Sequence, residues 1–293
     1  MMTEPRVAMS QLGFPDTSFE EDIAIAQEAG IAGISPDENK LIDGAEVSLS
    51  KKMMDVGIET ALGTPATLTV LPVLDPNMPP GAPDPDERVA SIVGAMERLA
   101  PFRPVSVLVI TGPVGELADR EARARVIDGM RALAAEARRL GLRLGIEPMR
   151  EANRPTWSFV CSLAETLDLL DEIGEDDMGI VFDTWHMWDS ADVYDMIPKA
   201  VDRIHGVQIA DYRDPNRSSM DRVIAGDGIA KIDRLVASLT EAGYDGWYEL
   251  EIFSDDGRFG NDFADSLWKL EPLEYAKRQL EGFRRCWPHR LTS

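Results

Sequence analysis

Four oxygen-bearing side chains stand near the ends of short apolar segments in the second half of the chain. Each segment has the composition of a buried strand, and the four side chains belong to Glu147, Asp183, Gln208 and Glu251. A carboxylate in an apolar strand is costly to bury unless it is paired or binds a metal. Four ligands that share one cation would offset that cost, and an all-oxygen set favours Mg²⁺ or Mn²⁺ over zinc. The sequence therefore predicts one divalent metal ion, Mn²⁺ or Mg²⁺, held by these residues.

Each of the four also has a purely structural interpretation. A polar residue at the end of a strand can pair with an arginine or cap the helix that follows. Taken singly, none of them identifies a functional site. Their occurrence on four successive predicted strands favours one shared site.

The elements that must position these residues alternate along the whole chain, with short apolar strands between longer helical patterns. The predicted strands are RVAMS (6–10), GIAGIS (30–35), VGIETAL (56–62), VSVLVIT (105–111), LRLGIEP (142–148), MGIVFDT (178–184), IHGVQIAD (204–211) and GWYELEIF (246–253). Predicted helices begin at Ser18, Asp119 and Ser162, and others end at glycines such as Gly243. Eight strand–helix repeats predict the α/β class, as a (β/α)8 TIM barrel in one domain over residues 1–293.

An open, doubly wound sheet is the alternative fold. It is disfavoured because no GxGxxG or Walker-type loop follows the first strand. The segment LPVLDPNMPPGAPDPDE (71–87) is rich in proline and aspartate. We interpret it as a long loop after the third strand, because the helix that follows is needed to continue the repeat.

A barrel of this kind gathers the side chains at the carboxyl ends of its strands into one active site. Glu249 and Glu251 share a strand, and we expect only Glu251 to face the interior. We expect Asp211 to orient one of the metal ligands by contact with it, without binding the metal itself. The aromatic residues that could form apolar walls of the site are Phe14, Trp157, Trp185 and Trp188.

The bulk composition excludes several classes of partner. The formal charge is −22, from 30 basic and 52 acidic side chains, so nucleic acids and anionic membranes are disfavoured. Only two cysteines occur, Cys161 and Cys286, which argues against a disulfide framework. With no apolar segment of transmembrane length and no leader pattern, we expect a cytoplasmic protein.

The motifs GIEP, FDTWH, VQIAD, GDG and GYDGWYELEIF resemble the sugar phosphate isomerase/epimerase family, which is built on the xylose-isomerase-like TIM barrel. The resemblance covers most of the chain and is densest between residues 147 and 253. It implies the same four metal ligands that the strand ends suggest. Many members carry histidine at the third position, whereas Gln208 is similar to hydroxypyruvate-isomerase-like and some 3-dehydroshikimate-dehydratase-like members.

The resemblance also implies roles for the remaining polar residues. Glu147 and Glu251 would be the catalytic acid and base, while His186 and Arg222 would bind the substrate. The implied activity is isomerisation or epimerisation of a keto- or aldo-sugar, or a related hydroxy-ketone, through an enediolate. The alternative is a dehydratase or lyase that expels water or a leaving group β to a carbonyl, from a keto-sugar, keto-inositol or dehydroshikimate-like compound.

Two further classes fit less well. An apurinic endonuclease branch shares this barrel, but it needs histidine-rich zinc sites and a basic face, and this chain has three histidines and a charge of −22. A non-catalytic sugar-binding barrel would leave the acids without a metal. The predicted partner is therefore a small polyhydroxylated carbonyl compound, and the C-terminal segment FRRCWPHR leaves a homo-oligomer open.

Overall fold

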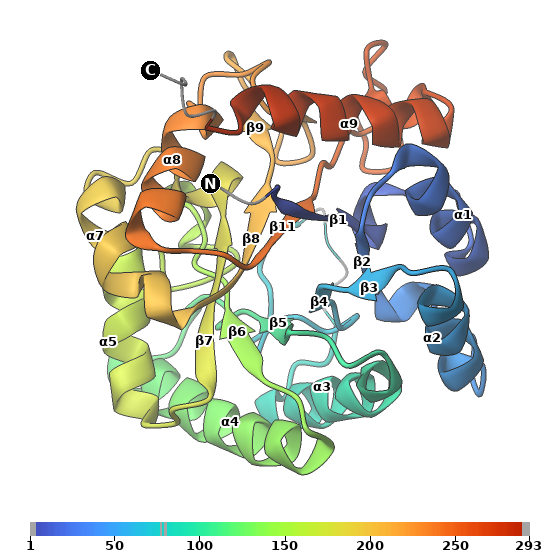
Figure 1. Cartoon of the computed structure of the whole chain (residues 1–293). Helices are drawn as coiled ribbons and strands as arrows, with labels where there is room; N and C mark the ends of the chain where they lie inside the picture. The colour runs from blue at the N-terminus through green and yellow to red at the C-terminus, as the bar shows by residue number, and fades with distance from the viewer. Residues whose placement is uncertain (1–3, 77, 79–80, 289–293) are drawn as a thin grey trace.

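The computed structural model describes residues 4–76, 78 and 81–288 and has a barrel of parallel strands surrounded by helices (Figure 1). The strands of the barrel are β1 (Arg6–Ser10), β2 (Gly33–Ser35), β3 (Glu59–Thr60), β4 (Leu62–Gly63), β5 (Ser106–Val109), β6 (Leu144–Ile146), β7 (Met178–Asp183), β8 (Ile204–Ile209) and β11 (Trp247–Leu250). Their order is β3-β2-β1-β11-β8-β7-β6-β5-β4, and every pair is parallel. Each contains part or all of a predicted strand.

The barrel closes through β3 and β4, which only Ala61 separates. β3 pairs with β2, whereas β4 pairs with β5. The Ala61 N–H donates to the Ile34 carbonyl at 3.0 Å, and the Ala61 carbonyl accepts from the Val105 N–H at 2.7 Å. The two short strands are therefore halves of one, which confirms the predicted α/β class and (β/α)8 TIM barrel.

Helices cover the outside of the barrel (Figure 1). They are α1 (Phe19–Ala29), α2 (Glu46–Asp55), α3 (Pro85–Leu99), α4 (Asp119–Leu140), α5 (Leu163–Ile173), α7 (Val193–Ala200), α8 (Ile232–Ala242) and α9 (Pro272–Cys286), whereas the short α6 (Thr184–Met187) directly follows β7. Local capping contacts explain why α1 begins and ends where the sequence predicts. Ser18 caps α1 by accepting from the Glu21 N–H, and the Glu21 carboxylate accepts from the Ser18 N–H. Gly30 ends α1 with φ of 73°, a conformation that glycine adopts without strain.

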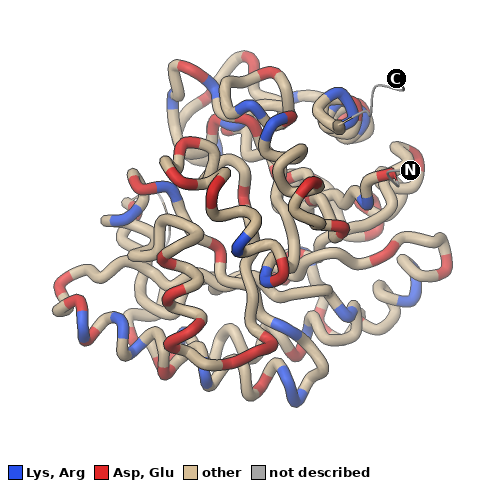
Figure 2. The backbone as a smooth tube through the Cα atoms, turned by 60° about the vertical axis from the view of Figure 1, so that its left-hand side comes forward, with Lys and Arg blue, Asp and Glu red and all other residues tan. Residues whose placement is uncertain are grey.

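The proline-rich segment behaves as predicted over its described residues. It runs outside the strands until Asp84 caps α3, whose first residue is Pro85. Acidic and basic residues are scattered over the chain and alternate along the surface helices (Figure 2). Among the described residues, no helix combines the length and apolarity needed to cross a bilayer.

Candidate active site

The four predicted ligands lie at the carboxyl ends of adjacent strands. Glu147 follows β6, Asp183 ends β7, Gln208 lies near the end of β8 and Glu251 follows β11. All four are at least 95% buried. Asp183 pairs in register with Gln208, which brings β7 and β8 to the same level of the barrel. The parallel topology therefore gathers side chains that are up to about a hundred residues apart in the sequence.

Arg222 links the two sides of this group. It begins β10 (Arg222–Val223), which pairs antiparallel with β9 (Asp211–Tyr212) outside the barrel. Its Nη1 lies 2.8 Å from Asp183 Oδ2 and 3.0 Å from Glu251 Oε2. Gln208 Nε2 donates to the other oxygen of Glu251 at 2.8 Å. Both oxygens of Glu251 therefore accept from protein N–H groups, and the predicted substrate-binding arginine lies among the predicted ligands.

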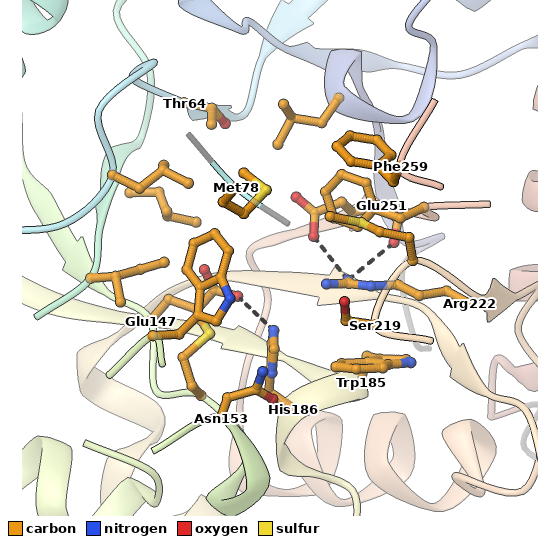
Figure 3. A pocket seen from close by; sticks show the side chains of 18 of the residues that line it. Thr64, Met78, Glu147, Asn153, Trp185, His186, Ser219, Arg222, Glu251 and Phe259 are labelled. Atoms are coloured by element: carbon orange, nitrogen blue, oxygen red, sulfur yellow. Dashed lines mark hydrogen bonds and ion pairs between the residues drawn. The ribbon is translucent and has the colours of Figure 1, made fainter. Parts of the chain in front are cut away.

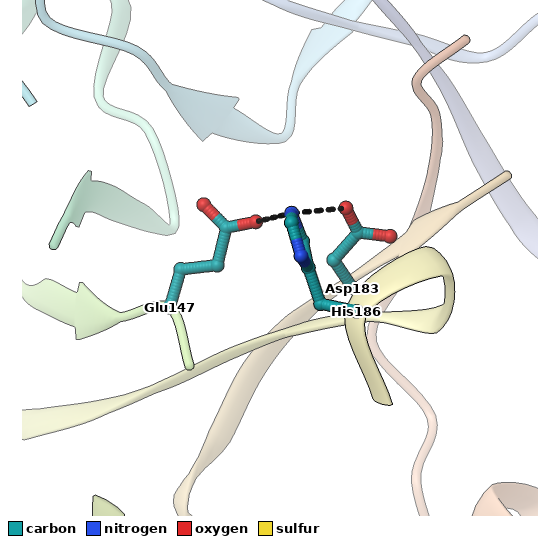
Figure 4. A group of neighbouring side chains, drawn as sticks. All are labelled: Glu147, Asp183 and His186. Carbon is teal, nitrogen blue, oxygen red and sulfur yellow. Dashed lines mark ion pairs between the residues drawn. The ribbon is translucent and has the colours of Figure 1, made fainter. Parts of the chain in front are cut away.

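His186, on α6, lies between the two remaining acids (Figure 4). Its Nε2 is 3.7 Å from Glu147 Oε1 and 3.6 Å from Asp183 Oδ2. Glu147, Asp183 and His186 each offer one atom within 4.8 Å of the others, which is close enough to hold a metal ion together. The Arg150 N–H donates to His186 Nδ1 at 3.2 Å, so the proton of a neutral ring is on Nε2. In this tautomer Nε2 is a donor, which fits contact with an oxygen better than ligation of a metal.

The ionisation of these groups follows from their burial. Burial raises the pKa of Glu147 well above its usual value, and the neighbouring Asp183 and Glu251 add to the shift. Burial also raises the pKa of Glu251, while Arg222 opposes the change. Burial lowers the pKa of His186, and Arg222 and Arg150 add to the effect. The site thus holds a neutral imidazole beside carboxylates that bind protons more readily than exposed ones.

Glu249 corrects one expectation from the sequence. It is fully buried, and neither carboxylate oxygen has a hydrogen-bond partner. Burial raises its pKa to about 7, while the polar side chains of Ser10, Ser35 and Gln208 oppose the shift. These neighbours come from β1, β2 and β8, so Glu249 faces the interior as Glu251 does. The expectation of opposite faces was wrong, because residues two apart in a strand share a face.

Asp211 has a different role from the one expected. Its carboxylate accepts four backbone N–H groups, from Tyr212, Gly226, Gly228 and Ala230, at 2.8 to 3.1 Å. A Cβ on Gly228 would lie 2.4 Å from the Tyr212 carbonyl oxygen, so only glycine fits there. Asp211 therefore fixes the loop that follows β10.

A cavity of about 300 Å³ opens above these polar groups. Glu147, His186, Arg222 and Glu251 all line it, as the close view shows (Figure 3). Of the four aromatic residues proposed as walls, Trp157 and Trp185 line the cavity. Phe14 instead packs on Tyr275 at 5.0 Å, and Trp188 packs on Tyr212 at 5.0 Å. The predicted catalytic and substrate-binding residues therefore share one cavity.

The donor atoms present are suited to a divalent metal ion. Gln208 Oε1 is buried and has no hydrogen-bond partner, so it is available as a neutral oxygen ligand. Glu147, Asp183, Glu249 and Glu251 are four buried acids beside one buried arginine. Such an excess of acids needs protons or a further cation. Arg222 Nη1 competes with a metal ion for Asp183 Oδ2 and Glu251 Oε2.

Comparison with known families accounts for most of the chain. The profile of the xylose isomerase-like TIM barrel family matches residues 23–286. No curated protein sequence matches the chain. The sequence signal therefore extends from α1 to the last residue of α9.

Solved structures with low sequence identity share the fold. The protein SMc04130 from Sinorhizobium meliloti 1021 is 22% identical, with a TM-score of 0.83 over 97% of this chain and 99% of that chain. The IOLI protein with a bound zinc atom is 16% identical, with a TM-score of 0.76 over 96% and 97%. The 3-keto-D-glucoside 4-epimerase YcjR from E. coli is 19% identical, with a TM-score of 0.73 over 97% and 100%. At these identities the likeness establishes the architecture.

Proposed function

We propose that this chain, which belongs to the xylose isomerase-like TIM barrel family, is a divalent-metal-dependent isomerase or epimerase of a keto- or aldo-sugar or a related hydroxy-ketone. One observation carries the proposal: Glu147, Glu251, Arg222 and a neutral His186 line a single cavity, and two further buried acids, Asp183 and Glu249, lie close to them. Among similar structures, one is named a 3-keto-D-glucoside 4-epimerase and another an L-ribulose 3-epimerase. Those names support chemistry at a carbon near a carbonyl group.

The proposed ligands of Mn²⁺ or Mg²⁺ are Glu147, Asp183, Gln208 and Glu251. When bound there, the ion would polarise the carbonyl group of the substrate as a Lewis acid. Gln208 would contribute its unpartnered Oε1. Proton transfer and substrate binding are assigned to side chains that line the cavity.

The proposed base is Glu147, which removes the proton from the carbon next to the carbonyl. Its carboxylate lines the cavity, within reach of a substrate bound there. Glu251 then returns the proton to the resulting enediolate. Return to the opposite face of the same carbon gives an epimer, and return to the neighbouring carbon gives the aldose–ketose isomer. His186 Nε2–H and Arg222 donate to substrate oxygens and hold the developing negative charge.

The proposal predicts that solvent hydrogen enters the substrate. Protein loaded with Mn²⁺ is incubated in D2O with keto-sugars and keto-inositols, and NMR follows deuterium at carbon. Exchange that requires the intact Glu147 would support enolisation. Absence of exchange from every candidate, with Mn²⁺ demonstrably bound, would remove the main support. A product that absorbs in the ultraviolet as an enone would identify the dehydratase or lyase outcome.

A further inference from the structure

The cavity above the acids is mostly apolar. Eleven of the nineteen described residues that line it are aliphatic, methionine or aromatic. Its charged groups, by contrast, lie at the floor, where Glu251 pairs with Arg222 and Glu147 points toward His186 (Figure 3). The cavity thus has a polar end suited to a hydroxy-carbonyl group and an apolar end of different chemistry.

One apolar wall stands beside Glu147. Leu108, Ile110 and Met149 are buried in a cluster that is separate from the main core. Leu68 and Trp157 are only partly buried and pack against this cluster. All five line the cavity, so this wall offers a continuous apolar face from β5 and its neighbouring loops.

The second apolar wall stands beside Arg222 and is aromatic. Phe253 and Phe259 both pack against Trp268, with ring centroids 6.3 and 6.1 Å away. The Arg222 Cζ lies 4.8 Å from the centre of the Trp185 ring and 4.6 Å from that of Phe253. The guanidinium therefore lies between two aromatic rings, beside the charged groups of the cavity floor.

Few groups in the apolar end could satisfy the hydroxyls of a sugar. A buried hydroxyl without a partner costs a substantial part of the binding free energy. The uncharged amides and hydroxyls of the described lining belong to Asn39, Thr64, Asn153 and Ser219. Of these, Asn39 already donates its amide to Asp37 Oδ1 at 2.9 Å. The Trp157 Nε1–H is likewise engaged, with Asp75 Oδ2 at 2.9 Å.

A phosphate group is also poorly matched to this cavity. Arg222 is the only lysine or arginine among the described residues of the lining, and it is already paired with Asp183 and Glu251. Glu147 and Glu251 would repel a second negative charge. The end of the substrate that lies away from the floor is therefore uncharged.

We propose that the substrate carries an uncharged aromatic or similarly flat apolar group joined to the hydroxy-carbonyl unit that is enolised. The inference rests on the proposed function for the orientation of the polar end. The apolar group lies between the wall of Leu108, Ile110 and Met149 and the wall of Phe253 and Phe259. Removal of the apolar surface of both ligand and walls from water drives its binding.

A matched pair of ligands tests this proposal, since 2-hydroxyacetophenone and hydroxyacetone differ only by phenyl in place of methyl. Calorimetric titration of the Mn²⁺-loaded protein is expected to give at least about tenfold tighter binding of the phenyl compound. The Phe259→Ala and Trp157→Ala variants should lose most of this preference. Ser219→Ala, a polar position of the same lining, should retain it. Equal affinities for the two compounds, or tighter binding of a ketohexose than of either, would overturn the proposal.

Deuterium exchange on the same samples separates the two hypotheses. If the phenyl compound binds tightly but neither compound exchanges its carbon-bound hydrogens, the result supports an apolar substrate group and contradicts enolisation. If both compounds exchange their carbon-bound hydrogens and bind with equal affinity, the result supports enolisation and contradicts an apolar substrate group. Circular dichroism and thermal melting of each variant ensure that a lost preference does not reflect a lost fold.

Discussion

Two clusters of buried charge, one beside α1 and one at the cavity floor, are balanced very differently. Near α1, Asp22 pairs with Lys40 at 2.6 Å and also accepts from Gln11 Nε2 at 2.8 Å and from the Thr17 hydroxyl. Lys40 donates in addition to the Phe14 carbonyl. One acid here meets one base, and the polar atoms of the pair are hydrogen-bonded. This cluster has the features of a structural ion pair.

The cavity floor shows the opposite balance. Four buried acids, Glu147, Asp183, Glu249 and Glu251, lie near one buried cation, Arg222, which pairs with Asp183 and Glu251 alone. Buried atoms of Glu249, Gln208 and Arg222 have no hydrogen-bond partner. Folding alone does not account for such an arrangement, because like charges and unpartnered polar atoms destabilise a buried site. The contrast indicates that an excess of buried acids over partners marks the functional cluster.

The largest expected effect is on catalysis at the unbalanced cluster. Glu147→Gln and Glu251→Gln should each reduce deuterium exchange by about 10³-fold, because each removes a proton-transfer group. Urea denaturation should show no loss of stability, because each change relieves repulsion among the four acids. Glu172→Gln, an exposed acid paired with Arg123, is the control and should keep full exchange. Wild-type exchange in either site variant would exclude that residue from the mechanism.

A stability effect is expected at the balanced cluster. Lys40→Met leaves the Asp22 carboxylate buried without its cation and should cost about 3 kcal/mol of unfolding free energy at pH 8. Burial already raises the pKa of Asp22 to about 6, and loss of Lys40 would raise it further. A raised carboxyl pKa gives stability that is present at low pH and lost as pH rises. The deficit should therefore shrink at pH 5.

Urea titrations at both pH values measure the Lys40→Met deficit. The control is Lys51→Met, which removes an exposed pair with Asp55 and should leave the denaturation midpoint unchanged. A deficit that grew at pH 5, or an equal loss in the control, would contradict the description of Asp22 and Lys40 as a buried structural pair.

The smallest expected effect concerns metal affinity. Arg222→Met removes a cation that lies 2.8 and 3.0 Å from two proposed ligands. Mn²⁺ should then bind about tenfold more tightly, because the competing positive charge is gone, although exchange activity should fall. Calorimetric titration with Mn²⁺ gives the affinity, and Arg285→Met, an exposed change, serves as the control. Weaker Mn²⁺ binding by Arg222→Met would mean that Arg222 helps to assemble the metal site.

The sequence predicted the barrel because its signals are local. Strands such as MGIVFD are buried along their whole length, and helices start at caps such as Ser18 and stop at glycines such as Gly30. The polar residues at the strand ends could be found for the same reason. The parallel topology then brings Glu147, His186 and Glu251 to one cavity, and it places Asp183 beside His186 and Arg222. Their roles stay predictions until the variants are measured.

Other features depend on contacts that no local pattern encodes. The position of Arg222 is set by the β9–β10 hairpin and by the rings of Trp185 and Phe253. The apolar walls combine Leu68, Trp157 and Phe259, which belong to three loops far apart in the sequence. The strand period alone, by contrast, is sufficient to place Glu249 on the same face as Glu251.

Strand ends supply the floor of the cavity and loops supply much of its walls, and this division affects how substrate specificity could change in evolution. The acids of the floor are attached to strands whose register fixes their separation. Much of the apolar lining comes from loop segments, including those that contain Leu68, Trp157 and Phe259. Loops tolerate insertion and substitution far better than barrel strands do. Proteins with this arrangement could therefore evolve to accept substrates with a different apolar group while they keep the same proton-transfer chemistry.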